Sequence, residues 1–168
     1  LEPTSGTISV ELLDIIKAPK PIQKRIGYLP ENCPVWPEMT VIDYLEYQAG
    51  LHGVAEKDKV AAIRYAIEKT NLKDKASQSI QTLSRGYRQR VGVAQAILHH
   101  PDIIILDEPT NHLDLEMIEW LEAFFAKENI TIFMITHDRY FLERVCNEII
   151  ELDQGEIFNY KGLQNFLR

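Results

Sequence analysis

Two adjacent acids end an apolar run in the middle of the chain. The run IIIL at residues 103–106 leads directly into Asp107 and Glu108. Neighbouring carboxylates repel each other, so both stay charged more easily beside a cation or a water network. A magnesium ion on a nucleotide would serve, with Asp107 in its coordination sphere and Glu108 aligning an attacking water molecule. The pair taken alone leaves an ordinary structural role as an equal alternative.

A histidine stands at the same place relative to the next apolar segment. In ITIFMITHD, which begins at Ile130, Thr136 and His137 follow the apolar residues. Ligands of parallel sheets bind beyond the carboxyl ends of the strands, so we expect His137 near Asp107 and Glu108. A neutral imidazole there could donate one hydrogen bond to a γ-phosphate or to the attacking water. A purely structural histidine is the alternative.

A third candidate site begins a helix upstream of the acids. In the segment LSRGYRQR, Ser84 and Gly86 would offer an anion a hydroxyl, free amide groups and a favourable helix dipole. The alternative is a plain serine-capped helix. Arg85, Arg88 and Arg90 make this helix start basic. They form either a solvated face or a contact with the phosphate of a partner or with RNA.

The elements that position these residues alternate between strand and helix after residue 100. The three helices before that point have no strand between them, so they indicate a helical insertion. The run before the acids is typical of a central parallel strand covered on both faces. His52, His99 and His100 flank helix ends, where we expect capping or solvent exposure. We predict strands at about 7–10, 25–30, 103–106 and 130–135, helices at 40–51, 56–72, 84–99, 115–127 and 138–146, and a hairpin turning at 153–155.

The length and the net charge of the chain limit the kinds of protein that it can be. The 168 residues suit one domain, and acids outnumber bases by 25 to 18, which argues against a free DNA-binding protein. No apolar run approaches the ~20 residues of a membrane helix, and no secretory leader is visible. Cys33 and Cys146 are lone thiols without metal-ligand spacing, so a reduced, cytoplasmic setting is predicted.

The order of the motifs resembles the second half of an ABC-type ATPase nucleotide-binding domain. LSRGY, a helix, IIILDE, a turn containing Asp114, and ITH follow one another as they do in that family. The resemblance covers nearly the whole chain and implies an α/β fold of the P-loop NTPase type. Residues 1–168 would then form a single partial domain, with a sheet core (1–31 and 100–168) and a helical subdomain (about 32–99).

The resemblance also implies roles for individual residues around ATP and Mg²⁺. Asp107 matches the Walker B aspartate at the metal, Glu108 the catalytic glutamate and His137 the switch histidine. Glu31 stands where the family usually has glutamine, and it is expected beside the magnesium ion. Asp114 matches the aspartate of the D-loop.

The signature motif of the family is matched in part. Ser84 and Gly86 agree with LSGGQ, whereas Arg85 and Tyr87 depart from it. In the family two domains pack head to tail, and the signature of one closes over ATP held by the other. The resemblance therefore implies a second ABC ATPase domain as partner, whose nucleotide would contact Ser84, Arg85 and Gly86.

The phosphate-binding motif GxxxxGK[ST] is absent from the sequence. In the family, a segment like LEPTSGTI follows shortly after that motif, so the chain is expected to begin just downstream of it. The motif supplies most phosphate-binding amides and a lysine. We therefore expect the isolated chain neither to bind ATP usefully nor to hydrolyse it.

The two parts of the chain resemble different branches of the family. Up to about Pro109 the sequence looks like ATPases that drive membrane exporters, and from Thr110 onward it looks like the F-type proteins that act on ribosomes, so we suspect a mosaic. The first hypothesis is an ATP-hydrolysing module of an exporter, bound to a membrane-spanning subunit at the inner face of the membrane. The alternatives are a soluble ribosome factor and a non-catalytic, truncated remnant.

Overall fold

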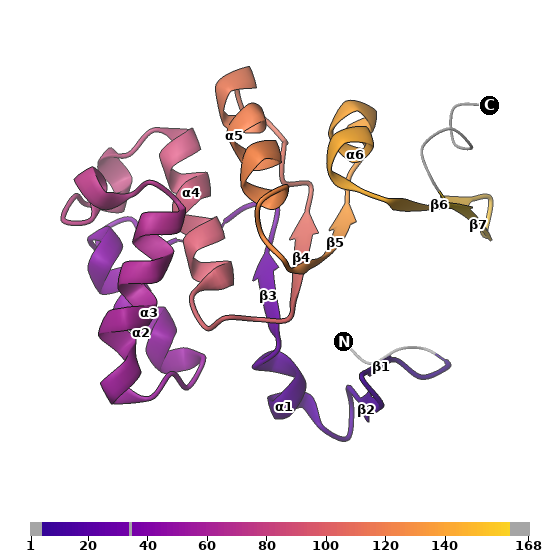
Figure 1. The fold of residues 1–168 in the computed structure, drawn as a ribbon, viewed down its shortest axis with the longest axis horizontal. Helices are drawn as coiled ribbons and strands as arrows, with labels where there is room; N and C mark the ends of the chain where they lie inside the picture. The colour runs from indigo at the N-terminus through magenta and orange to yellow at the C-terminus, as the bar shows by residue number, and fades with distance from the viewer. Residues whose placement is uncertain (1–4, 34, 162–168) are drawn as a thin grey trace.

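A three-stranded parallel sheet lies at the centre of the molecule (Figure 1). The computed structural model describes residues 5–33 and 35–161 of the chain. The sheet has the order β3 (Ile26–Leu29), β4 (Ile103–Asp107) and β5 (Thr131–Ile135), so the strand that carries the acids is in the middle. The predicted α/β fold with a parallel sheet is confirmed.

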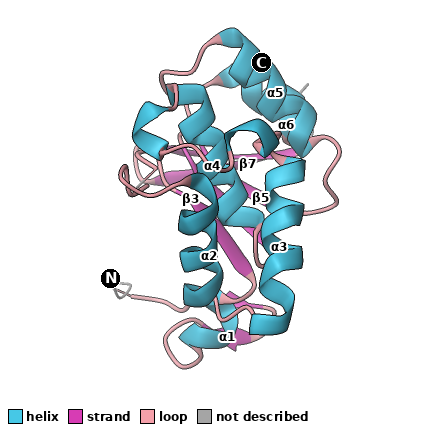
Figure 2. Cartoon of the chain, turned by 90° about the vertical axis from the view of Figure 1, so that its left-hand side faces the viewer, coloured by secondary structure: helices cyan, strands magenta, loops and turns pink. Residues whose placement is uncertain are grey.

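Three helices form the layer beside β3. α2 (Val41–Leu51) and α3 (Glu56–Lys69) lie side by side, and α4 (Arg85–Ile97) packs between them and β3 (Figures 1 and 2). Two 3₁₀ turns, Lys73–Lys75 and Ile80–Thr82, connect α3 to α4. α2 and α3 were predicted from their apolar periodicity and α4 from its Ser84 cap, although α3 ends three residues and α4 two residues earlier than expected.

The remaining elements follow β4 in alternation. α5 (Leu115–Phe125) connects β4 to β5, and α6 (Arg139–Val145) follows β5. The hairpin of β6 (Glu148–Asp153) and β7 (Glu156–Lys161) is antiparallel, as predicted. Its turn contains Gly155 with a φ of +85°, a conformation that glycine adopts without steric cost.

The start of the chain differs from the prediction. The strand expected at 7–10 is only β1 (Ser9–Val10), paired in a short hairpin with β2 (Leu13–Asp14). A five-residue helix, α1 (Pro19–Gln23), was not predicted. Its two prolines suggest a break in a helix interior, but a proline at the first helical position costs no hydrogen bond.

Two glycines allow α4 to approach β3 closely. A Cβ on Gly27 would overlap the backbone carbonyl of Ala96, and one on Gly92 would overlap the side chains of Cys33 and Leu29. Close packing of α4 on β3 therefore requires a residue without a side chain at both positions. The largest fully buried side chains are Tyr44, Phe141, Leu29, Leu45, Leu72, Ile80, Leu98, Ile104, Leu106, Leu121, Val41 and Val91.

The sheet is covered more completely on one face than on the other. Gly27 and Ile104 are register partners, so Ile104 lies on the face that α4 covers and is 1% exposed. On the opposite face Phe133 and Ile135 are 53% and 52% exposed. The prediction that β4 is covered on both faces is therefore wrong in part, because its alternate residues are only half-buried.

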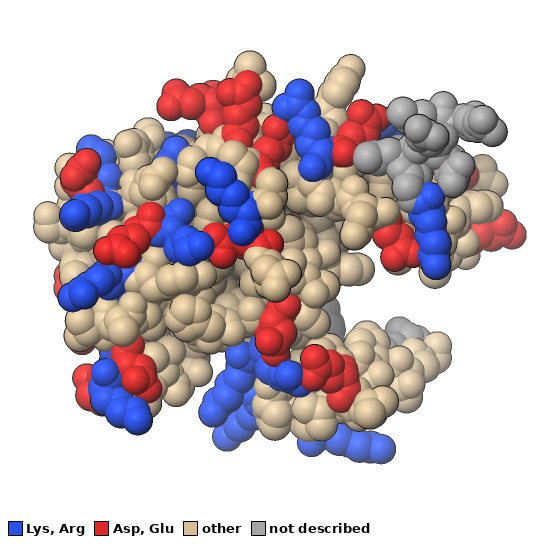
Figure 3. Space-filling model, in the orientation of Figure 1, with Lys and Arg blue, Asp and Glu red and all other residues tan. Residues whose placement is uncertain are grey.

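The surface of the described part of the chain is charged and mixed in sign. Over the helices on the face that Figure 3 shows, acidic and basic side chains are interspersed. No helix in the described ranges is both long and apolar enough to pass through a bilayer.

Candidate active site

The carboxyl ends of the three parallel strands bring four predicted site residues to one edge of the sheet. Asp107 is the last residue of β4, and Glu108 follows it. His137 comes two residues after β5, and Glu31 two residues after β3. Parallel strands place their carboxyl ends together, so segments far apart in the sequence meet here.

Glu108 and His137 are in direct contact. The Nδ1 atom of His137 lies 3.0 Å from Oε2 and 3.1 Å from Oε1 of Glu108, with hydrogen-bond geometry to Oε1. Oε2 is buried and has no hydrogen-bond partner among the described residues. The hydrogen bond to Glu108 and the charge of that carboxylate raise the pKa of His137, to which Asp138 and Glu31 contribute further.

This contact changes the expected protonation of the histidine. A neutral imidazole has one N–H donor, and a carboxylate can only accept. With Nδ1–H donating to Glu108, a neutral His137 has no donor left for a phosphate. The imidazolium form, which the raised pKa favours, also offers Nε2–H, and the side chain is 77% exposed. The prediction of a neutral donor is therefore replaced by that of a charged one.

The backbone of Glu108 adopts an unusual conformation. Its φ is +45°, in the left-handed region that few residues other than glycine occupy. Its amide donates to the carbonyl of Ile135 over 2.8 Å, and its carbonyl accepts from the amide of Asn111 over 3.2 Å. Such strain costs about 1–3 kcal/mol and persists where the surroundings fix it. These two bonds direct the carboxylate toward His137.

The other two carboxylates have partners of their own. Glu31 accepts a hydrogen bond of 2.9 Å from the side-chain amide of Asn111. Asp107 lies 3.5 Å from the hydroxyl of Tyr28, whose pKa is raised by burial and by the Asp107 charge. No three His, Cys, Asp or Glu side chains of the described ranges could hold a metal ion by themselves. Magnesium on a nucleotide needs only one or two carboxylates, so this finding does not conflict with the prediction of Asp107 and Glu31 as its ligands.

The signature residues lie in a different hollow. Ser84 and Gly86, at the start of α4, line a hollow of about 110 Å³ with Asp114, at the start of α5. Ser84 Oγ accepts from the amide of Tyr87, and Asp114 Oδ1 accepts from the amide of Met117, so both residues cap their helices. Glu108 and His137 do not line this hollow.

The three arginines of α4 differ in their surroundings. Arg85 lines a second hollow of about 210 Å³ together with Glu31. Arg88 donates to the carbonyl of Leu83 over 2.8 Å. The Arg90 guanidinium lies 4.3 Å from the ring centroid of Trp120, and burial lowers its pKa. The expected basic face is therefore wrong for Arg90, which joins α4 to α5 by a cation–π contact.

Two contacting residues escaped the sequence-based prediction. Asn111 contacts both Glu31 and Glu108, and the side chain of Gln89 donates to the carbonyl of Pro109 over 3.0 Å. Asn111 belongs to the part of the chain, from Thr110 onward, that resembles the F-type proteins and not the exporter ATPases. That change of resemblance, together with glutamate in place of glutamine at position 31, was the sequence feature that could have pointed to this contact.

Comparison with known proteins gives a consistent picture. The sequence profile described as "ABC transporter" matches residues 1–111. The chain is 37% identical over 137 residues to the uncharacterized ABC transporter ATP-binding protein YfmR of Bacillus subtilis (82% of this chain, 21% of YfmR). It is 34% identical over 173 residues to the energy-dependent translational throttle protein EttA of Haemophilus influenzae (82% of this chain, 31% of EttA).

A solved structure has the same fold. It is an ATP-binding subunit of an ABC transporter, 25% identical in sequence, with a TM-score of 0.78. The superposition covers 96% of this chain and 69% of the other. The chain thus spans most of this solved domain, but only 21% and 31% of the length of the curated relatives YfmR and EttA.

Proposed function

Because this chain belongs to the ABC transporter family, we propose that its carboxylate–histidine cluster hydrolyses ATP as part of an intact nucleotide-binding domain. The observation that carries the proposal is the contact between Glu108 and His137 at the carboxyl ends of neighbouring strands. A carboxylate and an imidazolium side by side can position a water molecule and a terminal phosphate oxygen together.

Each side chain of the cluster has a distinct task in this proposal. Glu108 accepts a hydrogen bond from the attacking water, aligns it and acts as its base, and the buried Oε2, which accepts no hydrogen bond within the described residues, supports that role. His137 donates Nε2–H to a γ-phosphate oxygen. Asp107 and Glu31 would hold Mg²⁺, which would supply positive charge to offset that of the nucleotide phosphates. In water-poor surroundings such fixed charges stabilise a transition state strongly.

The remaining parts of the ATP site come from elsewhere. The 168 residues contain no GxxxxGK[ST] motif, so the proposal requires a phosphate-binding loop from residues outside this sequence. β5 is an outer strand of the described sheet, which supports pairing with a further strand, and the half-exposed Phe133 and Ile135 on the uncovered face support packing of further residues there. A second ABC ATPase domain would place its nucleotide against Ser84 and Gly86, and the separate hollow at these residues supports that arrangement.

The test is the substitution Glu108→Gln in the protein encoded by the complete reading frame around these residues. We expect ATP to remain bound while turnover falls by about 100-fold or more, since the amide cannot act as a base. Glu38→Gln, at an exposed acid before α2, is the matched control. Normal turnover of the Glu108 variant would refute its assignment.

Two partner classes fit such an ATPase. In the first, hydrolysis drives membrane export, and the module binds a membrane-spanning subunit from the cytoplasmic side. The exposed aromatic pair Trp36 and Tyr47, with ring centroids 4.6 Å apart beside α2, supports protein docking there. In the second, the module acts on ribosomes, and the similarity to EttA, a translational throttle protein by name, favours it.

Sedimentation separates these two functions. Cell lysate containing the tagged full-length protein is fractionated with ATP and the Glu108→Gln substitution, which should retain the bound state. Export predicts recovery with membranes, and action on translation predicts co-migration with ribosomes. Recovery in neither fraction contradicts both partner proposals but leaves the ATPase proposal to be judged by turnover.

A further inference from the structure

We propose that Asn111 is a positioning residue, which holds the Glu31 carboxylate beside Glu108 at the carboxyl edge of the sheet. The inference rests on the proposed function for the reaction that these carboxylates serve. It concerns a contact between two loops, one after β3 and one after β4, which are 80 residues apart in the sequence.

Asn111 makes two contacts that link the loop after β3 to the loop after β4. Its side-chain amide donates to Oε1 of Glu31 over 2.9 Å, and its main-chain amide donates to the carbonyl of Glu108 over 3.2 Å. One residue thus ties Glu31 to the strained backbone of Glu108. Asn111 is half-buried and Glu31 is exposed, so this hydrogen bond lies at the surface of the molecule.

The Glu31 carboxylate also has arginine side chains nearby with which it could form an ion pair. It lines the hollow of about 210 Å³ that also contains Arg85 and Arg88. Arg88 already donates to the carbonyl of Leu83, while Arg85 forms no ion pair within the described residues. An exposed ion pair contributes little free energy. A single well-placed hydrogen bond is therefore enough to keep the carboxylate on the Glu108 side.

The residue types at the two positions are matched as donor and acceptor. An asparagine amide donates, and Glu31 accepts. Aspartate at position 111 would set two carboxylates against each other. Glutamine at position 31 keeps an acceptor oxygen for Asn111, and its own amide could instead donate to an aspartate at 111. In the double variant the donor and the acceptor would therefore exchange places, and the hydrogen bond would be kept.

The test uses this reversal. Thermal unfolding of the full-length protein is measured for Asn111→Asp, Glu31→Gln and the double variant. We expect Asn111→Asp to lower the melting temperature by about 3 °C, since one hydrogen bond is replaced by a repulsion. The double variant should recover to within about 1 °C of Glu31→Gln. Asn32→Asp, which adds the same charge next to Glu31 without removing a hydrogen bond to it, is the matched control and should recover less than Asn111→Asp when combined with Glu31→Gln.

Turnover of the full-length protein provides the second measurement. Asn111→Asp should lower kcat by about tenfold to 100-fold, because a displaced catalytic group is costly. The double variant should regain the turnover of Glu31→Gln alone. A residue that only forms the turn would tolerate aspartate and show no such rescue.

The outcomes separate the positioning role from the proposed function. If Glu108→Gln abolishes turnover but the double variant recovers neither melting temperature nor turnover, only the role of Asn111 is overturned. If Glu108→Gln turns over normally, the ATPase assignment fails, even where the melting temperatures show the Asn111–Glu31 contact. Recovery in both measurements supports the positioning role.

Discussion

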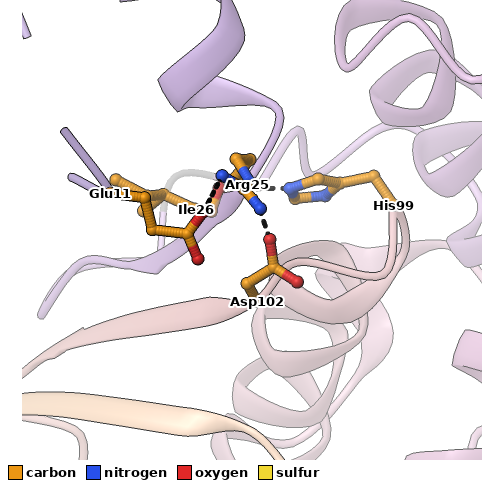
Figure 4. Close-up of polar contacts among 5 residues, drawn as sticks. All are labelled: Glu11, Arg25, Ile26, His99 and Asp102. Carbon is orange, nitrogen blue, oxygen red and sulfur yellow. Dashed lines mark hydrogen bonds and ion pairs between the residues drawn. The ribbon is translucent and has the colours of Figure 1, made fainter. Parts of the chain in front are cut away.

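Two histidines at opposite ends of the same sheet have opposite properties. His137, beyond the carboxyl end of β5, is exposed, and its contact with Glu108 raises its pKa. His99, beyond α4, reaches the amino end of β3, where its Nε2 lies 3.1 Å from the carbonyl of Ile26 (Figure 4). Burial and the neighbouring His52 and His100 lower the pKa of His99 to about 4.

The difference shows that the surroundings of each imidazole decide whether its charged or its neutral form is favoured. A carboxylate partner stabilises the charged ring of His137. At His99 the carbonyl of Ile26 also favours the charged ring, but burial, the larger effect, and the neighbouring imidazoles outweigh it. The rings of His52 and His99 are 3.9 Å apart and nearly parallel. His99 is therefore a neutral link between α2, α4 and β3, and the expectation of a cap or an exposed side chain is wrong for it. His137 is exposed, and its raised pKa favours the charged ring.

Close packing of α4 on β3 holds both ends of the sheet together, so it gives the largest expected effect. A Cβ at Gly27 would overlap the backbone carbonyl of Ala96, which cannot move unless α4 leaves the strand. We expect Gly27→Ala to cost at least about 3 kcal/mol of the free energy of unfolding, measured by urea titration. Gly92→Ala meets only side chains, those of Cys33 and Leu29, and should cost less. An equal loss of unfolding free energy in the two variants would contradict this, because it would mean that contact with the helix backbone is no more costly than contact with side chains.

The acid stability of the chain tests the neutral state of His99. The ordinary pKa of 6.5 is lowered to about 4 in the folded chain, so the unfolded state binds more protons between these values. Stability is therefore fully present above pH 6.5 and falls as the pH decreases toward 4. After allowance for partial exposure, the loss attributable to His99 is about 2 kcal/mol.

The control for this prediction is His99→Gln, which keeps a donor for Ile26 but does not titrate. Urea titrations at several pH values should show a flatter decline for this variant than for the unaltered chain. Carboxylates contribute equally to both, so the difference between the two curves isolates His99. Parallel curves would mean that His99 is already charged in the folded chain.

A smaller effect is expected at the other histidine. Glu108→Gln removes the charge that raises the pKa of His137, so ring NMR signals should report a pKa closer to 6.5. For a raised pKa the stabilisation is present below pH 6.5 and is lost as the pH rises through the folded value. His99 should not respond to this substitution. A change in the pKa of His99 with no change in that of His137 would contradict the assignment of Glu108 as the partner that raises the pKa of His137.

Sequence patterns predicted the elements and the edge where the charged residues meet. Apolar runs ending in Asp107 or preceding His137 indicate strands, and the parallel arrangement then follows from the intervening helices. Thr40, Ser84, Asp114 and Asp138 each accept an amide hydrogen bond at a helix start, as such residues typically do.

The finer contacts could not be predicted in this way. Asn111 and Glu31 meet only because β3 and β4 are adjacent, and no local pattern reveals a contact across 80 residues. The stacking of His52 on His99 depends equally on how α2 packs against α4. Periodicity reports which face of an element is buried, but not which polar side chains of two elements come together.

The ion pairs of Arg25 give the smallest expected effect. Its side chain pairs with Glu11 and, over 2.8 Å, with Asp102, at the same end of the sheet as His99 (Figure 4). All three side chains are more than a third exposed, so solvent screens the attraction. The carbonyl of Arg25 still accepts from the amides of Asp102 and Ile103 after the side chain is changed. We expect Arg25→Gln to lower the melting temperature by no more than about 2 °C, and the difference to shrink in high salt. The neutral His99 suggests that packing stabilises the amino end of the sheet. A larger fall in melting temperature that does not depend on salt would mean that this end is stabilised by the ion pairs of Arg25 instead.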